Sequence, residues 1–279
     1  MADQVAFTWV YVRYGALSAL GVYAISVVFG KSHSLWEWYY APVALAVGVA
    51  VAVSMWQTDK RHAQWRATAA TLGLDWSGSA PSPEDLPLLR AGHRGSFGDV
   101  AQGSWQGIGV LVGDYSYLTG SGKSEKSHPF LVACTNTGLD AATITIAPRG
   151  LVDRAEDALG HGGIQTESQE FDDAYELKCE DKECALKVVA EGFLSTLVDL
   201  IGQKPRVELE GGRLLCAVAQ RSNDELGVGV KELLGHLRDL RGRIPTIAAR
   251  DYPPSPVPTS VRSAIERRDP EVPEKDPAP

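Results

Sequence analysis

An apolar stretch near the start of the chain, residues 36–56, dominates its hydrophobic pattern. The single charge, Glu37, lies at its beginning, and no charged residue occurs from Tyr39 to Trp56. A helix of this length spans about 30 Å, the thickness of the hydrocarbon core of a bilayer. Trp and Tyr occur at both ends, as is typical of the two membrane interfaces. The pattern predicts a transmembrane helix.

A second apolar stretch, residues 5–30, comes before it and has Arg13 as its only charge. The uncharged run after Arg13 is just long enough to span a bilayer, with the arginine reaching toward the near interface. Two alternatives exist: Arg13 as an intramembrane site paired with a partner protein, or a cleaved signal peptide. The missing basic start and the missing A-x-A site before Lys31 argue against the signal peptide.

The two apolar stretches are joined by only a few residues, 31–35, which predicts an antiparallel transmembrane hairpin. Lys60, Arg61 and Arg66 follow the second span, whereas the connection holds only Lys31. The positive-inside rule therefore predicts a multi-pass protein of the cell membrane with both termini in the cytoplasm. The Ala and Gly residues of the second span would allow close packing within the hairpin or, alternatively, a homo-oligomer.

After a helix at residues 59–74 and a Ser/Pro-rich connector, the period of the pattern changes to that of strands. Strand signals begin at Phe97, and Gln106-Gly107 is placed as a two-residue turn. The strands are expected in meander order, which implies an antiparallel sheet. They cover residues 99–105, 108–118, 128–136 and 142–149.

The second half of this domain mixes helices with strands. A short helix, an acidic loop and a short strand are followed by an amphipathic helix with Asp181 as its N-cap, a hairpin around Gly211-Gly212, and a last amphipathic helix. The predicted elements cover residues 151–160, 167–173, 174–179, 181–202, 206–219 and 224–244. The tail is rich in Pro and charge, which is typical of disorder.

The predicted fold class is therefore α+β: a two-helix transmembrane hairpin, then a soluble domain with an antiparallel sheet and two main packing helices. The expected divisions are a hairpin at 1–56, a juxtamembrane helix and linker at 57–96, a cytoplasmic α+β domain at 97–250, and a disordered tail at 251–279.

Several short motifs within residues 72–243 carry a resemblance. The most telling is Asp114, Tyr115 and Tyr117 on a strand that leads into a Gly/Lys-rich turn; LPLLRAG, YELKCEDKECALKV and VELEGGRLL are the others. Together they resemble a family of bacterial, largely actinobacterial, membrane proteins with two N-terminal spans and a cytoplasmic α+β domain. The family has no assigned activity or catalytic residues, so the resemblance implies the domain plan alone.

The sequence GSGKS, Gly120 to Ser124, invites comparison with a phosphate-binding loop. Such a loop has a glycine five positions before Gly122, where this chain has Tyr117, and it leads from a strand into a helix. Strands are predicted on both sides here, which favours a β-turn.

Cys179 and Cys184 have a spacing that would permit a metal pair, but no second Cys/His pair of matching character follows. Glu180, Asp181 and Glu183 lie around them and would raise the pKa of a thiol, which disfavours redox work. Cys134, Cys179, Cys184 and Cys216 are too sparse for a disulfide framework, so reduced thiols are expected.

Two histidines are candidate general bases, His128 at a strand start and His161 in an acidic region, but no nucleophile is spaced to suit either. The acidic residues Glu167, Glu170, Asp172 and Asp173 lack the spacing of an EF-hand loop. No catalytic, cofactor-binding or metal-binding residue is therefore assigned.

The formal net charge of −8 argues against a nucleic-acid binder. We expect a membrane-tethered interaction or scaffold module, with the lipid bilayer and protein as partners and without a cofactor. The alternatives are a small-ligand or lipid sensor, which needs an enclosed apolar pocket, and, less favoured, an enzyme, which needs His128, His161 or the cysteines to converge with carboxylates.

Overall fold

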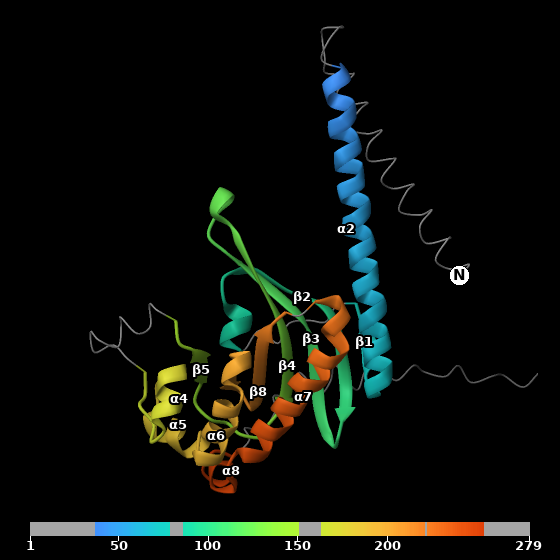
Figure 1. The fold of residues 1–279 in the computed structure, drawn as a ribbon. Helices are drawn as coiled ribbons and strands as arrows, with labels where there is room; N and C mark the ends of the chain where they lie inside the picture. The colour runs from blue at the N-terminus through green and yellow to red at the C-terminus, as the bar shows by residue number, and fades with distance from the viewer. Residues whose placement is uncertain (1–36, 79–85, 151–162, 221, 254–279) are drawn as a thin grey trace, which may run out of the picture. The chain divides into compact units, whose positions relative to one another are not determined.

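The computed structural model describes residues 37–78, 86–150, 163–220 and 222–253, with side chains described from Ala46 onward (Figure 1). The chain divides into two compact units. The first comprises Met1–Thr71 and Ser222–Gly227, and the second comprises Leu72–Arg221 and Val228–Pro279.

The described part of the first unit is built on one helix, α2 (Glu37–Leu72), of 36 residues. The helix predicted at residues 59–74 is therefore the second half of α2, and the chain leaves it through Gly73 at φ +70°. Two side chains of α2 hold the short helix η4 (Asn223–Glu225): Lys60 Nζ lies 3.3 Å from Asp224 Oδ1, and Arg61 Nη1 donates to Asn223 Oδ1 at 2.6 Å.

The predicted first span and its connection, residues 5–35, lie outside the described residues. Among the helices that the structure does describe, none is both long and apolar enough to cross a membrane. The transmembrane hairpin stays a prediction.

The second unit contains an antiparallel sheet of eight strands in the order β1-β2-β3-β4-β8-β7-β5-β6. Its α+β class and its antiparallel pairing confirm the sequence prediction. The strands are β1 (Asp75–Ser77), β2 (His93–Trp105), β3 (Ile108–Thr119), β4 (Lys126–Asn136), β5 (Ile144–Pro148), β6 (Tyr175–Cys179), β7 (Arg206–Glu210) and β8 (Arg213–Ala219).

The predicted four-strand meander is wrong at its last step. Strands β2, β3 and β4 are neighbours, but β4 pairs with β8, and β5 lies between β7 and β6. The two predicted tight turns are present. Gln106 and Gly107 join β2 to β3, Gly211 and Gly212 join β7 to β8, and all four have the positive φ that such turns require.

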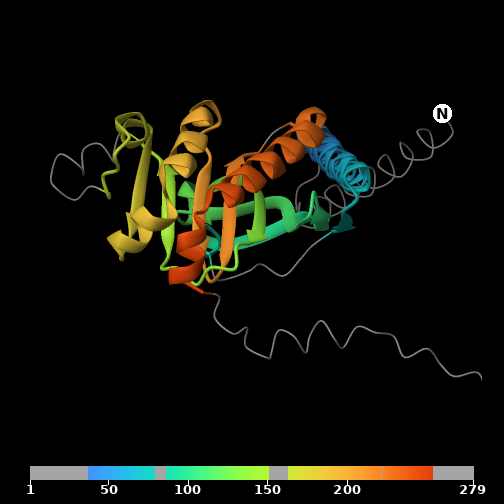
Figure 2. The same cartoon turned by 90° about the horizontal axis from the view of Figure 1, so that it is seen from below.

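The two faces of the sheet differ in what covers them. Helices α4, α6 and α7 lie over one face (Figure 2). The other face carries a core cluster in which Leu86, Leu88 and Leu89, in and beside the 3₁₀ helix η1 (Pro87–Arg90), pack on side chains of β2, β3, β4 and β8. Those strand residues are Phe97, Val100, Tyr115, Val132, Cys134, Leu215 and Ala217. The sheet is thus covered on both sides at its centre.

The helices are more numerous than the two predicted: α4 (Gln169–Ala174), α5 (Lys182–Val188), α6 (Glu191–Asp199), α7 (Leu226–Arg243) and α8 (Thr246–Asp251). The predicted helix 181–202 is broken, because the backbone leaves helical geometry at Val189 (φ −92°, ψ 62°) while its side chain stays buried. Asp181 caps α5 as expected, accepting from the Cys184 backbone N–H at 3.0 Å.

The acidic stretch predicted as a loop contains α4. Ser168 caps this helix by accepting from the Phe171 N–H, and Phe171 is buried with its ring 5.4 Å from that of Tyr175. The N-cap at Ser168 and the burial of Phe171 thus stabilise a helix in a stretch whose acidic composition indicated a loop. The predicted helix at 151–160 lies outside the described residues, as does the tail from residue 254.

Candidate functional site

A row of aromatic rings follows the β3–β4 hairpin. Tyr117 stacks on His128, with ring centroids 4.9 Å apart, and on Phe130, at 5.9 Å. Tyr115 continues the row inward at 6.3 Å from Tyr117, and its hydroxyl donates to the Leu89 carbonyl at 3.0 Å. Burial raises the pKa of the Tyr115 phenol. The inner end of the row is therefore core, whereas Tyr117, His128 and Phe130 are half-buried.

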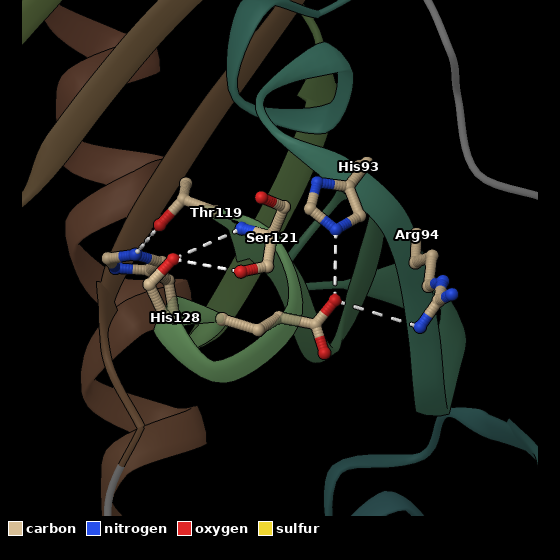
Figure 3. Close-up of polar contacts among 7 residues, drawn as sticks. His93, Arg94, Thr119, Ser121 and His128 are labelled. Carbon is tan, nitrogen blue, oxygen red and sulfur yellow. Dashed lines mark hydrogen bonds and ion pairs between the residues drawn. The ribbon is translucent and has the colours of Figure 1, made fainter.

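Polar side chains fasten the tip of this hairpin (Figure 3). His128 Nε2 and Thr119 Oγ1 lie 2.8 Å apart, and Glu125 Oε1 lies 3.1 Å from His93 Nε2 and 3.7 Å from Arg94 Nη1. The contacts of Glu125 join β2 to the tip of the hairpin, and the contact between Thr119 and His128 joins β3 to β4. The candidate general base His128 thus contacts a threonine hydroxyl and an aromatic ring.

The Gly120–Ser124 turn lies between the two strands of the hairpin. Its 3₁₀ helix η2 (Gly122–Ser124) has a single turn, and the Ser124 hydroxyl donates to the Ser121 carbonyl at 2.9 Å. A phosphate loop instead presents the backbone N–H groups of a following α-helix to its ligand. Here the chain enters β4 directly after Glu125.

A buried carboxylate lies at the centre of the face that carries η1. Glu208 on β7 is fully buried, accepts from the Leu88 N–H at 2.8 Å, and accepts from Arg206 Nε at 2.7 Å. One strand pleat away, Glu210 Oε2 accepts from Arg90 Nη2 at 2.6 Å. The two glutamates therefore hold both ends of η1 on the sheet.

Beside η1 the same face opens into a groove of about 980 Å³, the polar groove, over β5, β6 and β7. Its lining includes Arg90, Thr145, Lys178, Cys179, Glu180 and Glu210. Beside it, Glu176 is buried, with Oε2 2.8 Å from Lys178 Nζ and Oε1 without a hydrogen-bond partner among the described residues. The lining thus combines charged side chains with apolar ones such as Ile164 and Leu177.

The four cysteines are all free thiols, and the structure does not bring them together as one site. Cys134 and Cys216 are buried, and burial raises the pKa of each thiol to about 12. Cys184 is buried on α5, whereas Cys179 is half-buried at the end of β6. Burial raises the pKa of Cys179, and the charges of Asp181 and Glu180 raise it further.

Thiol labelling checks this description. Because three of the thiols are buried, we expect a maleimide to modify Cys179 first in the folded chain and all four cysteines after denaturation. The raised pKa of Cys179 predicts a rate that keeps rising with pH above the titration range of a free thiol. Peptide mapping identifies the modified residue, and equal labelling of Cys134 in the folded chain would contradict the prediction.

The remaining histidines and acidic residues do not converge on one site. His161 lies outside the described residues, and His236 Nε2 lies 3.1 Å from Gln203 Oε1. Asp172 accepts from the Thr166 N–H and hydroxyl, so it closes the loop before α4. Within the described ranges no group of three or more His, Cys, Asp or Glu side chains is arranged to hold a metal ion.

Sequence reasoning missed the buried glutamates. The one available signal was the alternation Arg206, Glu208, Glu210, which places three charges on one face of β7. Such alternation is typical of a face in contact with water. Only the docking of η1 makes this face internal at Glu208.

The comparisons with known proteins add little to this geometry. No protein-family model matches the chain, and no curated protein does. A solved structure to which it is similar is that of the mycobacterial trehalose monomycolate transport factor A, TtfA. The sequences are 11% identical, the match covers 70% of this chain and 98% of that chain, and the TM-score is 0.48. We draw no functional conclusion from a likeness of this size, and membership of the actinobacterial family stays a prediction.

Proposed function

We propose that the chain is a membrane-tethered interaction module, whose α+β domain meets protein partners at the inner face of the cell membrane. One observation carries the proposal. Five large apolar side chains of α2 are exposed within one short stretch: Val47, Val49, Val53, Met55 and Trp56. Apolar surface of this extent on a helix is normally buried against another protein or against lipid. Because the run is uncharged from Tyr39 onward, it is suited to contact with lipid.

The position of the charges on α2 supports the same proposal. The first charged residue after the apolar run is Asp59, and Lys60 Nζ lies 5.9 Å from the centre of the Trp56 ring. A tryptophan beside a lysine is typical of the border between hydrocarbon and headgroups. The helix continues from there to Leu72 without a break. A bilayer ending near Trp56 would leave the remaining turns in water.

The α+β domain supplies surfaces of the kind that interaction modules use. The tip of the β3–β4 hairpin is exposed, with half-buried aromatic rings behind it, and the polar groove is lined by groups of both charges. Aromatic side chains and arginine are enriched at protein interfaces. The sensor alternative requires an enclosed apolar pocket, which the polar groove is not.

Membrane attachment and topology test the proposal in intact cells. The full chain is expected to remain with the membrane pellet after alkaline carbonate washing. In a Cys179→Ser background, Ser260→Cys in the tail should react with an impermeant maleimide only after permeabilisation. The matched control, Ser32→Cys in the connection between the spans, should react from outside.

Two outcomes would contradict this function. Extraction of the chain by carbonate would show that it is not anchored in the membrane. Labelling of Ser260→Cys in intact cells would show that the tail lies outside the cell. Cross-linking in native membranes, followed by mass spectrometry, should then identify the protein partners of the proposed module.

A further inference from the structure

The tip of the β3–β4 hairpin is basic, in a chain whose formal net charge is −8. Every residue from Gly120 to Ser127 is exposed, and Figure 1 shows the hairpin extending beyond the rest of the second unit. The segments that form the tip, 92–96 and 119–128, contain three residues of the lysine or arginine type and one carboxylate: Arg94, Lys123, Lys126 and Glu125. We call this patch the basic tip.

The two lysines of the basic tip are not neutralised within the fold. The carboxylate of Glu125 lies against β2 instead, 3.1 Å from His93 Nε2 and 3.7 Å from Arg94 Nη1. Neither the Lys123 nor the Lys126 side chain makes a hydrogen bond or an ion pair with a residue that the structure describes. Their charges are therefore available to an anionic partner outside the chain.

The turn that carries the lysines is braced by its own contacts. The Ser124 hydroxyl bonds to the Ser121 carbonyl across η2, and Thr119 Oγ1 meets His128 Nε2 across the strands. The Tyr117 ring stacks on His128 directly behind the turn. Because the turn is already ordered, contact with an outside surface costs little further conformational entropy.

The hairpin is long enough to reach a membrane in which α2 is anchored. From Trp56, at the end of the apolar run, α2 continues to Leu72, which is about 24 Å of helix. The chain then enters the sheet through β1, which lies level with Val112 of β3. From Val112 to Gly120 the hairpin extends by about 26 Å. The two lengths match, so the tip can return to the headgroup layer that α2 leaves.

We propose that the basic tip binds the anionic lipid headgroups of the membrane to which α2 tethers the chain. The inference rests on the proposed function, because the tether keeps the tip within reach of one leaflet. Each basic residue at an anionic surface raises the binding constant about fivefold, so Lys123 and Lys126 bind weakly alone and effectively in the tethered chain. A second attachment point limits rotation of the α+β domain and thereby selects the faces that protein partners meet.

Reconstitution of the full chain in lipid nanodiscs tests the proposal. In a Cys179→Ser background, Ser121→Cys carries an environment-sensitive fluorophore, since the other three cysteines are buried. Quenching of this label by acrylamide, a neutral quencher in the aqueous phase, should fall about threefold when phosphatidylglycerol replaces about a third of the lipid in a phosphatidylcholine nanodisc. A label at Ser195→Cys, an exposed position on α6, should be quenched equally in both.

Charge reversal separates the basic tip from the net charge of the chain. The double change Lys123→Glu and Lys126→Glu should abolish the protection of the label, and so should about 0.5 M salt, because salt screens exposed charges. The matched control, Lys182→Glu with Lys231→Glu, makes the same change in net charge at exposed positions on α5 and α7. It should leave the protection intact.

Three results would overturn the proposal. The label at Ser121→Cys could be quenched equally in the two kinds of nanodisc, or it could be protected in phosphatidylcholine alone, which would show that anionic lipid is not needed. Protection that arises only on addition of soluble cell extract would make a protein or a nucleic acid the partner. The alkaline carbonate wash is independent of the label, so failure of the tip and failure of the tether are distinguishable.

Discussion

Glu208→Ala is expected to lower the free energy of unfolding of the α+β domain by about 2–4 kcal/mol. The Glu208 side chain is fully buried, and its two oxygens accept from different partners, Arg206 Nε and the Leu88 N–H. Alanine leaves the Leu88 N–H without its acceptor beneath η1. It also leaves Arg206, whose side chain is 29% exposed, beside an empty space.

A neighbouring glutamate provides the matched control. Glu210 lies on the same face of β7 and accepts from Arg90, but the Arg90 side chain is 53% exposed. Solvent screening limits such a pair, so Glu210→Ala should cost less than about 1 kcal/mol. Denaturant titration of the full chain in detergent, followed by near-ultraviolet circular dichroism, measures both. Equal losses would show that Glu208 does not hold η1. Glu208→Gln, which keeps one acceptor, should fall between them.

Gly113→Ala is expected to destabilise the domain by about 1–3 kcal/mol through overpacking. A Cβ atom at Gly113 would lie 2.7 Å from the Asp99 carbonyl oxygen and 2.9 Å from Val100 Cγ2. The close approach has a local cause, because the register of β2 against β3 shifts between Phe97 and Val100. Backbone of β2 is thereby brought over β3, where only glycine leaves room.

The control for Gly113 is a glycine on the same strand. A Cβ atom at Gly109 would meet nothing within 4 Å, so Gly109→Ala should change the free energy of unfolding by no more than about 0.5 kcal/mol. The same titration compares the two variants. If both cost the same, the loss at Gly113 reflects strand propensity instead of the contact with β2.

Features that depend on a few neighbouring residues were predictable. The Gln106-Gly107 and Gly211-Gly212 turns follow from residues that tolerate positive φ between apolar runs, and the cap at Asp181 follows from one side chain and one backbone N–H. Strand-forming runs predicted β2 to β8, although β2 begins at His93 and not at Phe97, and β1 (Asp75–Ser77) lies in the stretch expected to be a connector. Each of these choices is made within a few residues of chain.

Features that depend on distant pairing were not predictable. Residues of β8 and β7 enter the sheet between β4 and β5, so that Val132 pairs with Ala217 instead of with the next strand along the chain. The candidate surfaces depend on the same placement. Thr145, Lys178 and Glu210 meet in the polar groove because of that strand order.

By itself, the sequence determined the apolar run at 36–56, the α+β class, the tight turns and the helix cap at Asp181. These come from composition and from contacts local in the chain, which differ little between one fold and another. The tertiary structure alone decided the strand order, the burial of Glu208 beneath η1 and the polar groove. Burial and long-range pairing depend on which distant segments share a face of the sheet, and a single sequence does not specify that contact directly.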